Sequence, residues 1–472
     1  MSRGITQQRS CPAGFVRRPA LAVLLWLAPV AAAAPAITRV ELVTVTDTTA
    51  VLTWETSEPA EAVVRYGTQS DRLDRTASPG GPPGRYHCCE ITGLQPGTQY
   101  SFLCQSGAAE AGAGPREPGR FTTLVPPPGR ELFSFATMTD LHVGQQRTAR
   151  LVLHGKVISE GVRWREADIP LWQLAVGASI DEINARHPAF TVIKGDITEG
   201  LSAEEFPAAR DLLGRLKAPY FVVRGNHDPL NPFLRTFGLP QSWYGFDREG
   251  MHFVVLDTEP LAEAGDPALD RELTWLAKDL MEHKGQWTFV FVHRPVEPKL
   301  ARRSGEPFSE ELLRMSEGLL GRLYGSAATR TIDKATGHAP NVSEASARRL
   351  AELLRRHGRI AGVFAGHLHR NYVGYWPQET GNLPYVETAS TKEYPCGYAI
   401  TRVFSGGYMH NYYTPRDPRC LEWSAMTRDA YAKIGLQSKA GSLAERGFVV
   451  RFDRLRLAPT TRRRADGIRS RE

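Results

Sequence analysis

Asp, His and Asn side chains, which are able to bind metals, occur in five short clusters between residues 140 and 369. Each cluster follows an apolar run. The clusters are Asp140 with His142, Asp196, Asn226 with His227 and Asp228, His293, and His367 with His369. One such cluster alone is typical of a turn, and a lone histidine after a strand is more often structural than a ligand. Five clusters drawn almost only from Asp, His and Asn indicate one shared site.

The residue types indicate transition-metal chemistry. Imidazoles and carboxylates suit Zn, Mn and Fe, whereas an all-oxygen Ca or Mg site would not use four histidines. One carboxylate can bridge two ions, and two ions about 3.5–4 Å apart can bind the attacking and leaving oxygens of a phosphoryl displacement. Gly195, Gly225 and Gly366 precede three of the clusters and predict sharp turns that direct the ligands into one cavity.

The apolar runs before the clusters predict the strands that position them. These runs begin "LFSFATM", "AFTVIK", "YFVV", "WTFVFV" and "IAGVFA". They alternate with helical stretches such as "SEASARRLAELLRRHG", in which Ala345, Leu350, Leu353 and Leu354 recur near the helical period. This alternation predicts an α/β core, and the C-terminal strand ends of open α/β sheets share an edge where ligands bind.

Residues 37–124 have a different pattern, with short alternating runs such as "AVLTWET" and no helical period. The segment resembles a fibronectin type III domain, an all-β sandwich. The resemblance is carried by Trp54 and by the corner "LQPGTQY", in which the hydroxyl of Tyr100 is expected to tie its strand to the preceding turn. Such a domain often binds or positions something, so a surface or polymer ligand is an expected partner. A proline-rich linker, residues 125–131, follows.

In chain order, the clusters read D-x-H, G-D-x-x-E, G-N-H-D, a lone H and G-H-x-H. This order resembles the calcineurin-like metallophosphoesterase family over residues 132–413. The resemblance implies an α/β fold in which helices flank a two-sheet sandwich (α-β-β-α), within a domain of residues 132–458. It implies a hydrolase for phosphodiesters, phosphomonoesters or both, acting on a phosphate-ester small molecule or a nucleotide. The implied cofactors are two Mn, Fe or Zn ions, with a metal-bound hydroxide as nucleophile.

The resemblance also implies a role for each cluster. Asp140, His142 and His369 would hold the first metal, Asn226, His293 and His367 the second, and Asp196 would bridge them. His227 would be the general acid that protonates or stabilises the leaving oxygen. Glu199 occupies the position of the carboxylate that orients this histidine, and Asp228 is the alternative partner. The sequence leaves these two partners open.

Differences from the motifs of related phosphoesterases narrow the class of enzyme that this chain resembles. Purple acid phosphatases, which also carry a fibronectin-like N-terminal domain, place a tyrosine three residues after the bridging aspartate and use D-x-G. This chain has Glu199 and D-L-H at those places, so we expect no tyrosine ligand and no purple iron centre. The arginine of the protein-phosphatase motif G-D-x-x-D-R-G is also missing, because Glu199-Gly200-Leu201 stands where that motif has D-R-G. The chain is most similar to bacterial members related to cyclic-nucleotide phosphodiesterases.

The net charge of +7 does not indicate nucleic-acid binding. The first 36 residues carry four arginines and no acidic residue, and the last 12 carry five arginines against two acidic residues. These ends account for the whole excess, so the body of the chain is close to neutral and no nucleic-acid partner is expected. The basic tail, residues 459–472, is expected to be disordered.

Residues 1–36 have the pattern of a signal peptide. Arg17 and Arg18 precede an apolar run from Leu21 to Ala34, which is short for a membrane span and is followed by small residues suited to cleavage. We expect an exported protein, periplasmic or secreted, with no membrane span after removal of the signal. A retained N-terminal anchor is the alternative.

Five cysteines follow this segment, at positions 88, 89, 104, 396 and 420. Export permits disulfides, and the odd count leaves at least one thiol outside an intrachain bridge. The expected pairs are Cys396 with Cys420, and Cys88 or Cys89 with Cys104.

Weaker features have competing interpretations. Arg294 either reaches a substrate phosphate or forms an ion pair, and His252 and His338 are expected to be structural. Residues 143–187 and 296–340 are longer than simple connectors and form either a lid over the metals or surface insertions. The glycosylation sequon at Asn341 is interpreted as a chance match.

Two other functions are compatible with parts of the sequence. The chain could be a surface-binding protein on an inactive metallo-scaffold, but the ligands are intact in every cluster. It could also be a metal hydrolase for non-phosphate esters or amides, but the H-x-H that such enzymes carry on the first strand is absent.

Overall fold

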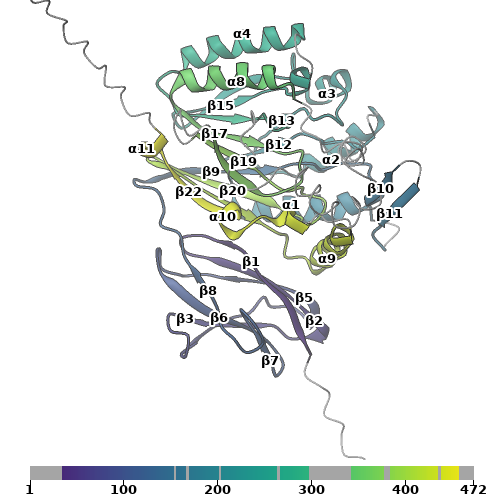
Figure 1. Cartoon of the computed structure of the whole chain (residues 1–472), viewed down its shortest axis with the longest axis vertical. Helices are drawn as coiled ribbons and strands as arrows, with labels where there is room; N and C mark the ends of the chain where they lie inside the picture. The colour runs from purple at the N-terminus through teal and green to yellow at the C-terminus, as the bar shows by residue number, and fades with distance from the viewer. Residues whose placement is uncertain are drawn as a thin grey trace, which may run out of the picture. The chain divides into compact units, whose positions relative to one another are not determined.

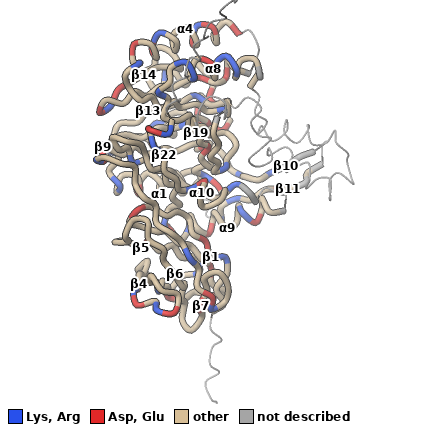
Figure 2. Tube along the Cα trace, turned by 60° about the vertical axis from the view of Figure 1, so that its left-hand side comes forward, with Lys and Arg blue, Asp and Glu red and all other residues tan. Residues whose placement is uncertain are grey.

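The computed structural model of the protein describes residues 35–153, 156–165, 169–200, 203–262, 266–296, 342–376, 383–433 and 437–455. Four expected features lie wholly or almost wholly outside these residues: the signal peptide, the 296–340 insertion with His338, the sequon asparagine Asn341 and the basic tail. Among the helices of the described ranges, none is both long enough and apolar enough to cross a membrane. Figure 2 shows acidic and basic residues interspersed along this part of the chain.

Two antiparallel sheets form the N-terminal part of the structure. One contains β1 (Ile37–Val45), β2 (Ala50–Ala60) and β5 (Gly84–Ile91); the other contains β3 (Val63–Gly67), β4 (Arg75–Ala77), β6 (Gln99–Ser106), β7 (Ala109–Ala111) and β8 (Gly119–Thr122). Trp54 and Tyr100 are buried in the core of this sandwich. The Tyr100 hydroxyl accepts a hydrogen bond from the backbone N–H of Gln95 at 3.0 Å, which confirms the predicted corner.

Two six-stranded sheets form the larger part of the structure. The first has the order β13 (Tyr220–Val223), β12 (Phe190–Lys194), β9 (Glu131–Met138), β20 (Tyr398–Phe404), β21 (Gly407–Tyr413) and β22 (Gly447–Arg451). The second has the order β14 (Tyr244–Arg248), β15 (Met251–Val255), β16 (Thr288–Phe291), β17 (Ile360–Ala365), β19 (Leu383–Glu387) and β18 (Tyr372–Trp376). β9, β12 and β13 are mutually parallel, as are β15, β16, β17 and β19. All five predicted strands that lead into the clusters are therefore present.

Helices cover the outer face of each sheet (Figure 1). α1 (Leu171–Arg186), α2 (Phe206–Leu213) and α3 (Leu230–Phe237) pack on the first sheet, and α4 (Pro267–Glu282) and α8 (Glu344–His357) pack on the second. The remaining elements are the β10 (Thr148–Leu153) and β11 (Lys156–Val162) hairpin, α9 (Pro418–Lys433), α10 (Leu443–Arg446), α11 (Phe452–Leu455) and the short helices η1 (Ala203–Glu205), η2 (Glu259–Ala262) and η6 (Gln437–Ala440). The predicted helix at 343–358 is confirmed as α8, capped by the Ser343 side chain and ended by Gly358 at φ 72°.

The two sheets face each other across an aromatic core. Phe135 from the first sheet packs edge-on against Phe289 and Phe291 from the second, with ring centroids 5.5 and 5.8 Å apart. Buried aromatic pairs of this kind add about 0.5–1.5 kcal/mol each beyond the area that they bury. The layers are thus helix, sheet, sheet and helix, which confirms the predicted α-β-β-α fold.

The expected disulfides are wrong for the described cysteines, because all five are free and buried. Cys88 and Cys89 lie on β5 in one sheet of the sandwich, whereas Cys104 lies on β6 in the other. Cys396 and Cys420 share a hydrophobic cluster, but their thiols donate to different carbonyls, those of Thr391 and Leu174. These thiols fill space in the core, where burial raises the pKa of Cys89 to about 12.

Candidate metal centre

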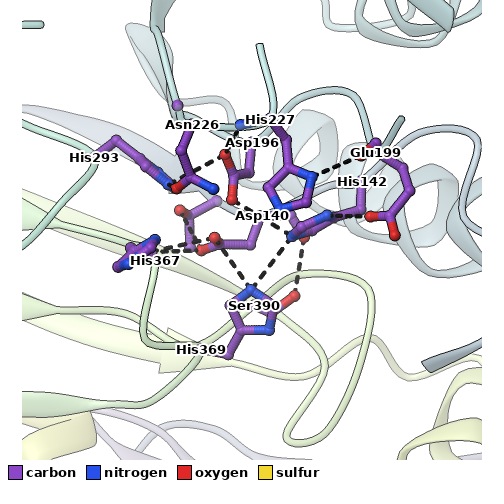
Figure 3. Close-up of polar contacts among 12 residues, drawn as sticks. Asp140, His142, Asp196, Glu199, Asn226, His227, His293, His367, His369 and Ser390 are labelled. Atoms are coloured by element: carbon purple, nitrogen blue, oxygen red, sulfur yellow. Dashed lines mark hydrogen bonds and ion pairs between the residues drawn. The ribbon is translucent and has the colours of Figure 1, made fainter. Parts of the chain in front are cut away.

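The five clusters meet at one edge of the two facing sheets (Figure 3). Asp140 and His142 follow β9, Asp196 follows β12, and Asn226 and His227 follow β13. The second sheet contributes His293 after β16, and His367 and His369 after β17. The structure therefore brings together side chains that are separated by up to 229 positions in the chain, counted from Asp140 to His369.

The backbone at this edge has an unusual conformation. Asp140, His142, Asp196, His367 and His369 all have positive φ angles, between 45° and 70°. This left-handed region is disfavoured for residues with a side chain, although Asp and His enter it more readily than most. Conformations of this kind persist only where the surrounding structure imposes them, and they are concentrated at functional sites.

The glycines beside the clusters serve two purposes. Gly195 has the expected positive φ, 86°. Gly225 and Gly366 instead allow close approach: a Cβ at Gly225 would lie 2.1 Å from the backbone nitrogen of Asp196, and one at Gly366 would lie 2.0 Å from the Thr139 hydroxyl. The prediction that glycine turns direct the ligands is therefore correct for Gly195, whereas the other two glycines provide space.

The first group of donors contains Asp140, His142 and His369. The Nε2 atom of His369 lies 3.2 Å from Oδ1 of Asp140 and 3.3 Å from Nε2 of His142. All three residues are buried. Two imidazole nitrogens and a carboxylate oxygen at these separations fit the ligand shell of one transition-metal ion.

The second group contains Asp196, His293 and His367, with Asn226 beside it. The Nε2 atom of His293 lies 3.2 Å from Oδ1 of Asp196 and 3.1 Å from Oδ1 of Asn226. The other Asp196 oxygen lies 3.7 Å from Nε2 of His142, in the first group. Asp196 is therefore placed between the two groups, where one carboxylate can serve both.

The outer nitrogens of three histidines are held by oxygen atoms. The Nδ1 atom of His293 donates to the carbonyl of Lys194 at 2.8 Å, that of His142 faces Oε2 of Glu199 at 2.5 Å, and that of His369 faces Oε1 of Glu393 at 2.6 Å. These contacts place a hydrogen on Nδ1 and direct Nε2 into the site, where it is the atom available to bind a metal. Metal-binding histidines almost always have such an outer partner.

The electrostatics of the site also favour a cation. Burial lowers the pKa of His142 to about 4 and that of His367 to about 3, so both rings are neutral donors at pH 7. Burial also opposes a charge on His293, but the adjacent Asp196 carboxylate outweighs it and raises the pKa of His293 to about 9. The carboxylates thus favour a positive charge in this buried site, and either a proton or a metal ion can supply that charge.

The expected carboxylate partner of His227 requires correction. The Nδ1 atom of His227 lies 2.6 Å from the backbone carbonyl of Glu199, whereas the Glu199 carboxylate faces His142. The alternative, Asp228, accepts hydrogen bonds from the backbone nitrogens of Gly225, Ile197 and Thr198 at 2.9–3.1 Å and so fixes the loops around Asp196. His227 is thus oriented by a peptide oxygen, and neither candidate carboxylate is hydrogen-bonded to its ring in the described structure.

Sequence reasoning missed a group of buried polar residues behind the first donor group. Glu393 accepts from the Thr148 hydroxyl and from Nζ of Lys439 at 3.0 Å, in addition to its contact with His369. Lys392 donates to Gln145, whose amide reaches Glu199 at 3.0 Å. A continuous chain of polar contacts therefore connects the outer partners of His142 and His369.

A signal for these residues was present but weak. Glu393 and Lys392 lie in "TASTKEYP", a few residues after β19, which is parallel to β17 and ends at the same edge of the sheet. The segment contains no histidine and forms no recognisable motif. Lys439 lies in η6, far along the chain, and only the fold brings it near.

The structure shows where three of the weaker candidates lie. Arg294 pairs with Glu259, with its Nε atom 2.7 Å from the carboxylate, so the ion-pair interpretation is correct. His252 lies at the opposite end of the second sheet from His293, since it pairs with Thr288 at the start of β16. The stretch 143–187 contains the β10–β11 hairpin and α1, which is part of the first sheet's helical cover.

Family comparisons cover both parts of the chain. Residues 133–371, half of the chain, match the family described as calcineurin-like phosphoesterase. Residues 35–123 match the family described as purple acid phosphatase, N-terminal domain.

Individual relatives are more distant. The glycerophosphodiester phosphodiesterase GpdQ of Enterobacter lignolyticus is 25% identical over 244 residues, which cover 50% of this chain and 71% of the relative. A probable cyclic nucleotide phosphodiesterase of Rhodopseudomonas palustris is 31% identical over 91 residues, covering 18% of this chain and 33% of the relative. The purple acid phosphatase from yellow lupin seeds superposes with a TM-score of 0.40 at 12% identity, covering 81% of this chain and 72% of that one.

Proposed function

Because the chain belongs to the calcineurin-like phosphoesterase family, we propose that it is a metallophosphoesterase that hydrolyses phosphodiesters at a centre of two transition-metal ions. The observation that carries this proposal is the convergence of two buried donor groups around Asp196. The choice of diesters is supported by the two sequence relatives named above, a glycerophosphodiester phosphodiesterase and a probable cyclic nucleotide phosphodiesterase. Phosphomonoesters are the second substrate class to be tested.

The proposed ligands follow from the two donor groups. Asp140, His142 and His369 would hold the first ion, Asn226, His293 and His367 would hold the second, and Asp196 would serve both. When bound, the ions supply positive charge to the phosphoryl oxygens and lower the pKa of water toward neutrality. Iron, manganese and zinc all suit this mixture of imidazole, carboxylate and amide donors.

His227 is proposed as the general acid for the leaving oxygen. Its ring packs against that of His142, with centroids 4.8 Å apart, and it is only partly buried, so a substrate can reach it. The Glu199 carbonyl accepts the Nδ1 hydrogen, which orients the ring. The Nε2 atom of the protonated ring then carries the hydrogen that is transferred to the leaving group. A general acid placed in this way contributes about 10²–10⁴-fold to rate.

The proposal is tested with metal-free protein reloaded separately with Mn, Zn and Fe. We expect hydrolysis of bis-p-nitrophenyl phosphate with a kcat/KM above that for p-nitrophenyl phosphate. The Asn226→Ala variant should lose metal and activity together, since its amide oxygen faces the second group. Absence of turnover on both substrates with every metal, in a folded protein that holds two ions, would exclude the proposed activity.

The His227→Ala variant separates acid catalysis from metal binding. It should keep both ions and lose about 10²–10⁴-fold in kcat on a diester with a poor leaving group. The loss should be small on bis-p-nitrophenyl phosphate, because nitrophenolate leaves without protonation. Equal losses on both substrates would show that His227 does not act as the acid.

Export and domain division are also part of the proposed function. The apolar run of residues 21–34 behind two arginines supports a cleaved signal peptide, and the pattern change near the proline-rich segment supports domains at 37–124 and 132–458. N-terminal sequencing of the protein from its native source tests the first point. A mature N-terminus near residue 37 is expected, and an intact Met1 would contradict it.

A further inference from the structure

A second cluster of histidine and aspartate lies at the far end of the second sheet. It consists of Asp247 on β14, His252 on β15 and His283, which caps the C-terminus of α4. One donor atom from each residue lies within 4.8 Å of the other two. The cluster is separate from the metal centre, because His252 pairs with the first residue of β16, whereas His293 follows the last.

One residue orients both imidazoles of this cluster. The side-chain Oδ2 of Asp279 accepts from Nε2 of His252 at 2.7 Å, and the backbone carbonyl of Asp279 accepts from Nδ1 of His283 at 2.7 Å. The remaining ring nitrogens face Asp247, at 2.8 Å for Nδ1 of His252 and 3.7 Å for Nε2 of His283. Outer carboxylate and carbonyl partners of this kind are characteristic of histidines that bind metal.

The surroundings of the cluster are also compatible with a small cation. The two rings stack with centroids 3.7 Å apart and an angle of 7°, so they form one compact pair of donors. A Cβ at Gly245 would lie 3.0 Å from His252, so the glycine leaves room for this ring. The Asp247 side chain is 52% exposed, which leaves one side open for entry of an ion and for a water ligand.

We propose that Asp247, His252 and His283 bind a further transition-metal ion of the zinc class, which fastens the β14–β15 hairpin to the end of α4. Two imidazoles and one carboxylate, with water in the fourth position, form a common zinc ligand set. A protonated His252 held between Asp247 and Asp279 is the competing state, in which the cluster is an ion pair without metal.

Zinc binding to the full chain distinguishes the two states. Metal-free wild-type protein, Asp247→Asn and His283→Asn are each dialysed against the same free zinc concentration, and zinc per chain is counted by atomic emission. We expect each variant to hold one zinc fewer than wild type. His187→Asn is the matched control, because His187 is an exposed histidine that also caps a helix C-terminus, and it should bind as wild type does.

The position of the ion supplies the second readout. Anomalous diffraction at the zinc edge should show a peak between Asp247 and His283 in wild type and none there in either variant. Both variants should keep their circular dichroism and their phosphoesterase turnover, since neither residue belongs to the proposed catalytic centre. Equal zinc content in wild type and in both folded variants, or no peak at this position, would overturn the proposal. That result would leave the proposed phosphoesterase activity unaffected.

Discussion

The outer contacts of the histidines account for much of the order at the site. His142, His293 and His369 each hold Nδ1 against a fixed oxygen, so their Nε2 atoms point inward before any ion arrives. The sequence predicted the inward residues from their types and order. It did not predict the outer partners. A backbone carbonyl such as that of Lys194 is present in every residue type, so the sequence cannot reveal its role, and Glu393 lies outside every motif.

Replacing Glu393 with Gln tests this dependence. The amide keeps the size of the side chain but removes the charge that faces His369 and Lys439. We expect the affinity for one of the two ions to fall about 10–100-fold, as is typical when an outer partner is lost. Competition with a chromophoric chelator measures the change.

A surface glutamate provides the control for that experiment. Glu282 pairs with Lys278 on α4 and its side chain is 57% exposed, so Glu282→Gln should bind both ions as tightly as wild type. Unchanged affinity in Glu393→Gln, with the fold intact, would mean that this carboxylate does not position His369.

At the level of elements, parallel strands from two sheets end at one edge and deliver the ligands. The strands were predictable because β12, β16 and β17 are buried throughout and β9 and β13 are buried at their C-terminal ends. Helix α8 was predictable from its period and caps. The positive φ angles of the ligands were not predictable. They follow from the crossing of loops such as those that contain Asp140 and Asp196, whose backbones are hydrogen-bonded to each other's segments.

The close approach at Gly225 provides a test of this packing. Gly225→Ala would force a methyl group against the backbone of Asp196, so we expect a loss of stability of about 1–3 kcal/mol and loss of metal from the centre. At Gly285 a Cβ would meet nothing within 4 Å, so Gly285→Ala should change stability by less than about 0.5 kcal/mol. Denaturant unfolding and metal content measure both effects. Equal behaviour of the two variants would contradict the close packing.

His410 on β21 gives the fold a defined pH dependence. Burial, with a smaller contribution from the charge of Lys194, lowers its pKa to about 3, so the folded state keeps it neutral. Below the unfolded value of about 6.5, the unfolded chain binds a proton that the folded protein does not, and stability falls by about 1.4 kcal/mol per pH unit. His410→Gln removes this term. The stability advantage of wild type over the variant should therefore shrink by about 2 kcal/mol between pH 7 and pH 5. A constant difference in the free energy of unfolding would show that His410 does not titrate in this way.

For the molecule as a whole, buried polar contacts join the N-terminal sandwich to the part with the phosphoesterase fold. The Asn411 amide on β21 donates to the Thr44 hydroxyl and to the Val45 carbonyl on β1, both at 2.9 Å. Arg446 on α10 pairs with Glu41 on the same strand. The pattern change along the sequence predicted two domains but not this attachment. The attachment depends on polar side chains such as those of Asn411 and Thr44, which are of types that usually lie on the surface.

Removing the Asn411 amide tests the attachment. Asn411→Ala leaves buried acceptors without their donor, which costs about 1–3 kcal/mol, so the thermal transition of the chain should move to lower temperature. Asn231 on α3 is exposed, and Asn231→Ala should change stability by less than about 0.5 kcal/mol. Scanning calorimetry compares the two variants. An unshifted transition in Asn411→Ala would show that these bonds contribute nothing.

The central claim is that residues from both sheets hold two metal ions around Asp196. Crystals of the reconstituted protein, measured at the absorption edge of the loaded metal, test it most directly. We expect two anomalous peaks about 3.5–4 Å apart, one among Asp140, His142 and His369 and the other among Asn226, His293 and His367, with Asp196 between them. A single ion, or no ion within bonding distance of Asp196 in fully loaded protein, would contradict the dinuclear centre and the function proposed from it.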